Sequence, residues 1–134
     1  MGLFSRRNPY DEMMGAQYLK ILKESVDIFN TTKNPDTFFQ RYALAEENAQ
    51  KLCKLKGVRF TGQQPNQIVK QLSDKKQAAI RDMLGRYFDD TVNKASKVKT
   101  SKSKLGKINL FITALEKYFP IMDDSNVQYV NELY

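Results

Sequence analysis

Apolar residues recur at helical spacing over most of the chain, and polar or proline-containing breaks separate the periodic segments. The first segment has Asn8 and Pro9 at its start, since asparagine caps free backbone N–H groups and proline fits the first helical turn. Its apolar positions are Tyr10, Met14, Tyr18, Leu22, Val26 and Phe29. Spacing of three or four residues aligns these side chains on one face. We therefore expect a helix from Pro9 to about Thr31.

The same start signal returns at Asn34 and Pro35, and it predicts a second helix that ends near Leu55. Gly57 follows that end, where a left-handed residue is common. The seam of this helix is Phe38, Tyr42, Ala45, Ala49 and Leu52. Its two alanines favour close approach of an antiparallel neighbour.

After a loop over 58–65, the pattern predicts one long third helix from Ile68 to Val98. Its interior Gly85 costs about 1 kcal/mol relative to alanine. The apolar positions of this helix are Ile68, Leu72, Ala79, Met83, Tyr87, Val92, Ala95 and Val98. The length of the seam offsets the cost of the glycine.

Two further helices complete the pattern. The seam of the fourth is Leu105, Ile108, Ile112, Leu115 and Phe119, and Pro120 stops it. The last helix has Val127, Val130 and Leu133 inward, with Asp123 or Asp124 as its cap. The sequence thus predicts an all-α fold, a compact bundle of about five helices with a long third helix. Residues 1–8 would form a flexible N-terminal tip, and residues 9–134 a single helical domain.

Composition agrees with one compact domain. The chain has 134 residues, of which 41% are hydrophobic and 28% charged, and this length suffices for one core. The lone Cys53 cannot form an internal disulfide, and the N-terminus lacks the pattern of a secretion signal. No uncharged apolar run approaches the roughly 20 residues that cross a bilayer. We therefore expect a cytoplasmic protein.

Catalytic chemistry finds little support in the sequence. Histidine is absent, which removes the usual general base and the commonest metal ligand. Cys53 next to Lys54 is better interpreted as a packed small side chain than as a nucleophile. Adjacent carboxylates such as Asp89 and Asp90 point about 100° apart on a helix, which disfavours a shared metal. We expect no catalytic residue, no metal and no cofactor, and hence no enzyme.

The charge pattern holds one anomaly. Six lysines fall within fourteen residues with no acid among them: Lys94, Lys97, Lys99, Lys102, Lys104 and Lys107. Without these six, the net charge of +7 would be +1. This lysine junction is therefore the candidate anion-binding site, although a merely solvated surface is the alternative interpretation. Its lysines scatter around a helix axis, which favours an exposed turn, and no aromatic residue interleaves them for base stacking.

Two stretches carry a resemblance to known proteins: NPDTFFQRY in the second helix and KASKVKTSKSKLGKINLF across the lysine junction. The chain resembles, from its first helix to its C-terminus, a functionally uncharacterised group of small helical proteins of Firmicutes and their mobile elements. The resemblance implies a helical domain and supplies no activity or site residue. Ser101 and Leu105 depart from the group, which would have an acid and another polar residue there.

Two functions follow as hypotheses. The first is a non-enzymatic helical interaction module of a bacterial or phage cytosol that binds another protein, with Phe39, Tyr129 or Tyr134 as exposed anchors. The alternative is binding of nucleic acid or an acidic membrane surface through the lysine junction 94–107. In that case three more cations of the preceding loop could assist: Lys54, Lys56 and Arg59.

Overall fold

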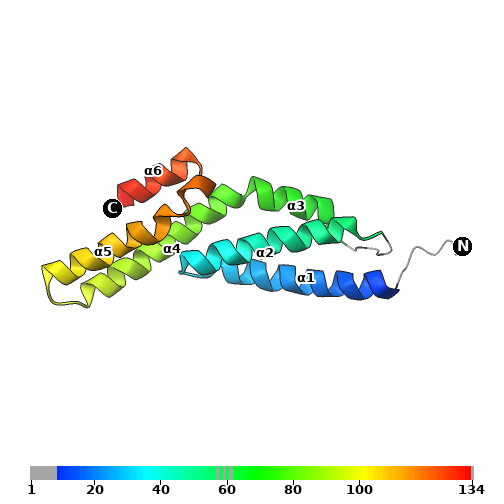
Figure 1. The fold of residues 1–134 in the computed structure, drawn as a ribbon, viewed down its shortest axis with the longest axis horizontal. Helices are drawn as coiled ribbons and strands as arrows, with labels where there is room; N and C mark the ends of the chain where they lie inside the picture. The colour runs from blue at the N-terminus through cyan, green and yellow to red at the C-terminus, as the bar shows by residue number, and fades with distance from the viewer. Residues whose placement is uncertain (1–8, 57, 59, 61, 134) are drawn as a thin grey trace, which may run out of the picture. The chain divides into compact units, whose positions relative to one another are not determined.

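The chain is helical throughout its regular structure, as seen in a computed structural model that describes residues 9–56, 58, 60 and 62–133. The helices of the described part are α1 (Pro9–Phe29), α2 (Pro35–Lys54), α3 (Pro65–Asp74), α4 (Lys76–Ser96), α5 (Ser101–Glu116) and α6 (Asp124–Leu133), with a 3₁₀ turn η1 (Phe119–Ile121) before α6 (Figure 1). The all-α prediction is confirmed. The predicted N-terminal tip, Gly57, Arg59 and Tyr134 lie outside the described residues.

The chain divides into two compact units. The first comprises Met1–Phe29 and Phe39–Lys75, and the second Asn30–Phe38 and Lys76–Tyr134. Helix α2 therefore begins in the second unit and continues in the first. The single domain over 9–134 stays a prediction.

In the first unit, α1 and α2 lie side by side (Figure 1), with the rings of Phe29 and Tyr42 4.5 Å apart between centroids. Ala45 and Ala49 of α2 are completely buried, as the close approach predicted for this seam requires. The Tyr42 hydroxyl donates a hydrogen bond to the Leu72 carbonyl of α3. Burial raises the pKa of Tyr42 to about 12.

The long third helix is wrong, because the segment is broken at Lys75 into α3 and α4. Lys75 leaves helical geometry with φ −98° and ψ 1°. Residues 73–77 are all polar, so no apolar contact carries the seam across this point. Ser73 and Asp74 also favour helix ends, since their side chains compete for backbone hydrogen bonds. The described residues consequently form six α-helices rather than about five.

In the second unit, α4 and α5 run antiparallel and form a helical hairpin (Figure 1). Phe111 of α5 packs against Tyr87 and Phe88 of α4, with ring centroids 4.9 and 5.7 Å away. Phe111 is 2% exposed, and Leu115 one turn later is completely buried. These contacts fix which turn of α5 faces which turn of α4.

The prediction that the seam of the fourth helix faces the core is wrong at its first residue, Leu105. Leu105 is 55% exposed, while Ile108 and Ile112 are half-buried. Phe111, which the seam omitted, provides the core contact instead. The helix also ends at Glu116, before Pro120, which lies inside the 3₁₀ turn η1.

Helix α6 is held on α4 by polar contacts. The Asp123 carboxylate caps it by accepting from the Asn126 N–H at 2.8 Å, which confirms one of the two predicted caps. The Asn126 amide donates to the Gln77 carbonyl at 2.9 Å. Arg81 donates to Asn126 Oδ1 at 2.9 Å, and its guanidinium lies 4.1 Å from the centroid of the Tyr129 ring.

The neighbours Phe111 and Leu110 test the α4–α5 packing. We expect Phe111→Ala to lower the free energy of unfolding by about 3–5 kcal/mol, because it removes a buried ring and leaves a cavity. Leu110→Ala should change it by no more than about 0.5 kcal/mol, because Leu110 is 61% exposed. Urea denaturation of both variants measures the difference. Equal losses would contradict the packing described for α5.

Candidate interaction surface

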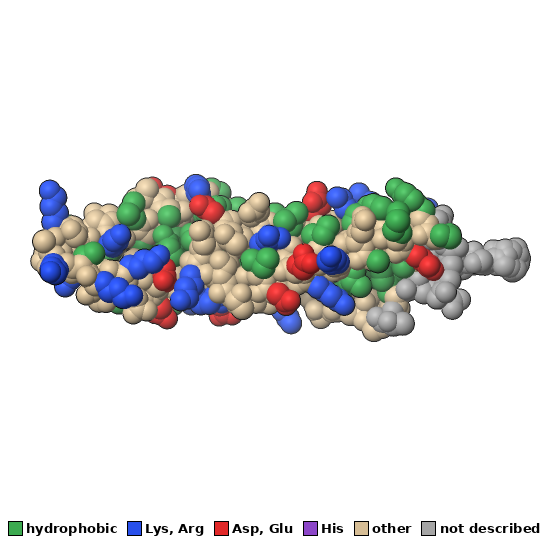
Figure 2. Space-filling model, turned by 90° about the horizontal axis from the view of Figure 1, so that it is seen from below, with side chains coloured by type: hydrophobic (Ala, Val, Ile, Leu, Met, Phe, Trp, Pro, Cys, Tyr) green, Lys and Arg blue, Asp and Glu red, His purple; other side chains and the backbone are tan. Residues whose placement is uncertain are grey.

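The lysine junction lies at the end of the α4–α5 hairpin. Lys94 is on the last turns of α4, Lys97 and Lys99 lie in the connection, and the other three lysines are on the first turns of α5. Thr100 starts α5 as its cap, accepting from the Ser103 N–H at 3.1 Å. All six lysines are exposed. Figure 2 shows Lys and Arg side chains projecting at its left end, where α4 and α5 meet.

One lysine of the junction is neutralised locally. Lys94 forms an ion pair of 3.0 Å with Asp90, one turn earlier on α4. Within the part of the chain that the structure describes, the other five lysines form no ion pair or side-chain hydrogen bond. Between Thr91 and Leu115 the sequence contains no Asp or Glu. The end of the hairpin therefore presents uncompensated positive charge to solvent.

Exposed apolar side chains accompany these lysines. Val92 of α4 is 44% exposed, and Leu105 and Leu110 of α5 are exposed by 55% and 61%. Helical spacing places Leu110 on the same side of α5 as Ala114, four residues later, whereas Leu105 shares its side with Ile112. The hairpin thus exposes apolar surface on two sides.

A groove of about 570 Å³ lies on the Ala114 side of the hairpin. Its walls are residues 31–36, which comprise the end of the α1–α2 connection and the start of α2, together with Tyr87, Asp90 and Lys94 of α4 and Ala114 of α5. Burial raises the pKa of the Tyr87 phenol, and the nearby Asp36 carboxylate adds to this effect.

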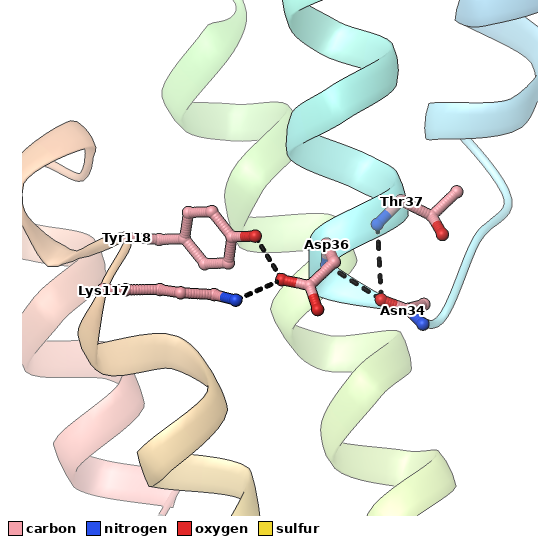
Figure 3. Close-up of polar contacts among 5 residues, drawn as sticks. All are labelled: Asn34, Asp36, Thr37, Lys117 and Tyr118. Carbon is pink, nitrogen blue, oxygen red and sulfur yellow. Dashed lines mark hydrogen bonds and ion pairs between the residues drawn. The ribbon is translucent and has the colours of Figure 1, made fainter.

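A polar cluster forms one edge of this groove (Figure 3). The Asn34 side chain caps α2 by accepting from the backbone N–H groups of Asp36 at 2.8 Å and Thr37 at 3.3 Å. The Asp36 carboxylate accepts from Lys117 Nζ at 2.8 Å and from the Tyr118 hydroxyl. The first turn of α2 is thus tied to the end of α5 within the second unit.

The cluster shifts the pKa of each partner. The hydrogen bond from Lys117 is the main reason that the pKa of Asp36 is lowered, and that from Tyr118 contributes next. The bond to Asp36 raises the pKa of Lys117 in turn, while burial and then the bond to Asp36 raise the pKa of Tyr118. The opposite shifts of Asp36 and Lys117 both follow from their hydrogen bond, which favours the charged form of each side chain. The cluster therefore serves as a structural tie.

The thiol, metal-binding and membrane-spanning features considered from the sequence do not belong to this surface. Cys53 is half-buried in α2 of the first unit. Among the described residues no group of three or more His, Cys, Asp or Glu side chains could hold a metal ion. No helix of the described ranges is long and apolar enough to span a membrane.

The aromatic anchors predicted for a partner need correction. Phe39 is 8% exposed and belongs to the core, because the first turns of α2 bury two successive phenylalanines. Tyr129 is half-buried and lies against Arg81, and Tyr134 lies outside the described residues. Lys54 and Lys56 are exposed, but they belong to the first unit. The large apolar residues exposed on α4 and α5 are the aliphatic Val92, Leu105 and Leu110. The predicted seams placed Val92 and Leu105 inward, which is wrong, and they did not include Leu110.

Comparison of the chain with protein-family models, with curated proteins and with solved structures finds no match. The resemblance to small helical proteins of Firmicutes therefore stays a prediction. The function has to be inferred from the surface itself.

We expect the Asp36 carboxyl to titrate below its ordinary pKa, and Lys117→Gln and Tyr118→Phe each to raise that pKa. The Lys117 change should have the larger effect, because its hydrogen bond is the main cause. Since the pKa of Asp36 is lower in the folded chain, the contact stabilises the fold above the unfolded-state pKa. That stabilisation is lost as the pH falls through the folded-state value. Carboxyl-carbon NMR titration measures each pKa.

Lys107→Gln is the matched control for this titration, because it removes the same charge from α5 ten residues earlier. It should leave the pKa of Asp36 almost unchanged, since exposed charges farther away are screened by salt. If the Lys107 and Lys117 variants raised the pKa of Asp36 equally, the shift would come from the overall positive charge and not from the specific contact with Lys117.

Proposed function

We propose that the chain is a non-enzymatic protein-interaction module that binds an acidic protein partner through the end of the α4–α5 hairpin. The observation that carries this proposal is the mixture of side chains there. Five lysines that form no ion pair with any described residue lie in the α4–α5 connection and on the first turns of α5, close in sequence to Val92 and Leu105. Positive charge steers an acidic partner, and exposed aliphatic side chains supply the apolar contact that holds it.

The alternative is a nucleic-acid or anionic-surface binder that uses the same lysine junction. The unpaired lysines favour it, since phosphate binding draws on such charge. The exposed apolar side chains argue for a protein instead, because phosphates offer them no partner. The large apolar residues exposed at this end are aliphatic, whereas binding of single-stranded nucleic acid relies on aromatic stacking.

An interaction module also agrees with the chemistry of the groove. Histidine is absent from the sequence, Asp90 is paired with Lys94, and Asp36 is held by two donors. Titratable groups that are already satisfied are poor general bases. As part of the same proposal, we place the module in a bacterial or phage cytosol, in keeping with its single cysteine.

Capture of partners by the tagged full chain tests the proposal. We expect an acidic protein to be recovered from lysate in a form that resists nuclease and dissociates as salt is raised. Lys99→Gln, Lys102→Gln and Lys104→Gln together should weaken binding of that purified protein about tenfold, because each exposed charge contributes about 0.5 kcal/mol. Isothermal titration calorimetry with the purified pair measures the loss.

The matched control carries Lys20→Gln, Lys23→Gln and Lys70→Gln, which removes the same charge from exposed positions of the first unit. Its affinity should equal that of the unmodified chain. Equal weakening by both triple variants, or loss of the partner on nuclease treatment, would reject the proposed function.

A further inference from the structure

The side of the hairpin opposite the groove carries a continuous apolar strip. Its members are Phe88 and Val92 of α4 and Leu105, Ile108 and Ile112 of α5. Phe111 sets Phe88 opposite this turn of α5, so Val92, one turn later on α4, lies level with the turn of α5 that precedes Phe111. The strip therefore crosses from one helix to the other. Phe88, Ile108 and Ile112 are half-buried, whereas Val92 and Leu105, which lie nearer the end of the hairpin, project into solvent.

Helix α6 already occupies the neighbouring part of this side. Residues 81, 85, 88 and 92 share one face of α4, because they follow the three-and-four spacing. Arg81 contacts Asn126 and Tyr129 of α6, and a Cβ at Gly85 would meet the Tyr129 hydroxyl at 3.8 Å. Phe88 and Val92 continue the same face, so the apolar strip extends the surface that α6 covers.

The direction of α6 also relates this helix to the apolar strip. Gln77 contacts the start of α6 at Asp123 and Asn126, whereas Arg81 and Gly85 contact Tyr129. Helix α6 therefore runs parallel to α4, and its C-terminal end points toward the strip. A second helix that continues the line of α6 would cover the strip by the same ridge-and-groove packing.

The lysines beside the apolar strip determine which charge a helix bound there should carry. Lys102 lies three residues before Leu105 and so flanks the exposed end of the strip, with Lys99 and Lys104 close to it in sequence. A second copy of this chain would bring the same cations to the same place, and like charges oppose that contact. A complementary partner presents carboxylates there.

We infer that the apolar strip is the docking surface for an acidic amphipathic helix of the partner protein, laid end to end with α6. The inference rests on the proposed function and names the part of the partner that is recognised. Leucine-like residues on one face of that helix cover Val92 and Leu105, while its acidic residues meet Lys99, Lys102 and Lys104. An anionic lipid surface suits the strip less well, because only Val92 and Leu105 among its members are exposed enough to enter lipid.

A synthetic helical peptide tests the inference with the full-length chain. The peptide has leucine at positions i, i+3, i+4 and i+7 and glutamate elsewhere, and a second peptide has lysine in place of glutamate. We expect the glutamate peptide to bind and to shift the NMR signals of Val92, Leu105 and Ile108. The lysine peptide should not bind.

The two exposed leucines of α5 provide matched variants, since they lie on opposite sides of the hairpin. Leu105→Gln should weaken binding of the glutamate peptide about tenfold, because it removes one apolar side chain from the contact. Leu110→Gln should leave the affinity unchanged. Fluorescence anisotropy gives both affinities, and circular dichroism confirms that both variants keep their helices.

Each other outcome overturns the inference. Weakening by Leu110→Gln alone would place the partner on the groove side, and the proposed function would stand. Failure of the glutamate peptide, together with retention of the chain on phosphatidylglycerol–phosphatidylcholine vesicles or on duplex DNA, would reject both the inference and the proposed function. Concentration-dependent dimerisation abolished by Leu105→Gln would assign the strip to a second copy of the chain.

Discussion

The second unit depends on the packing of Phe111 against Tyr87 and Phe88, which sets how α5 lies along α4. Because an α-helix rotates 100° per residue, this single contact determines the side to which every other residue of α5 points. Ala114 faces the groove, and Leu105 and Ile112 face the opposite side. The groove, the apolar strip and the spread of lysines over the end of the hairpin all follow from this register.

Much of the helical framework could be predicted from local chemistry. Asn34 and Pro35 start α2, and Asp123 caps α6, because such caps involve residues two or three positions apart. The α2 seam was also predictable, since all of its members are buried. The break at Lys75 was not, because apolar spacing on both sides of residues 73–77 is compatible with one continuous helix, and a polar interruption alone does not end a helix.

The candidate surface shows where sequence reasoning stops. The excess of lysine could be seen in the sequence, but its distribution over the end of the α4–α5 hairpin could be seen only in the structure. The ion pair between Asp36 and Lys117 joins residues 81 positions apart, and no local sequence pattern predicts it. The spacing of Leu105, Ile108 and Ile112 was interpreted as a core seam because periodicity reports an apolar face without saying what covers that face. Here no described element of the chain covers it fully.

The proposed docking of a partner requires that Val92 and Leu105 are exposed on the free chain. Methyl NMR with a neutral, soluble paramagnetic agent measures this directly, because the agent broadens signals of exposed methyl groups most. We expect strong broadening at Val92, Leu105 and Leu110, and protection of the buried Ile80, Leu115 and Val130. Protection of Leu105 equal to that of Leu115 would contradict this expectation, because the strip would then be part of the core.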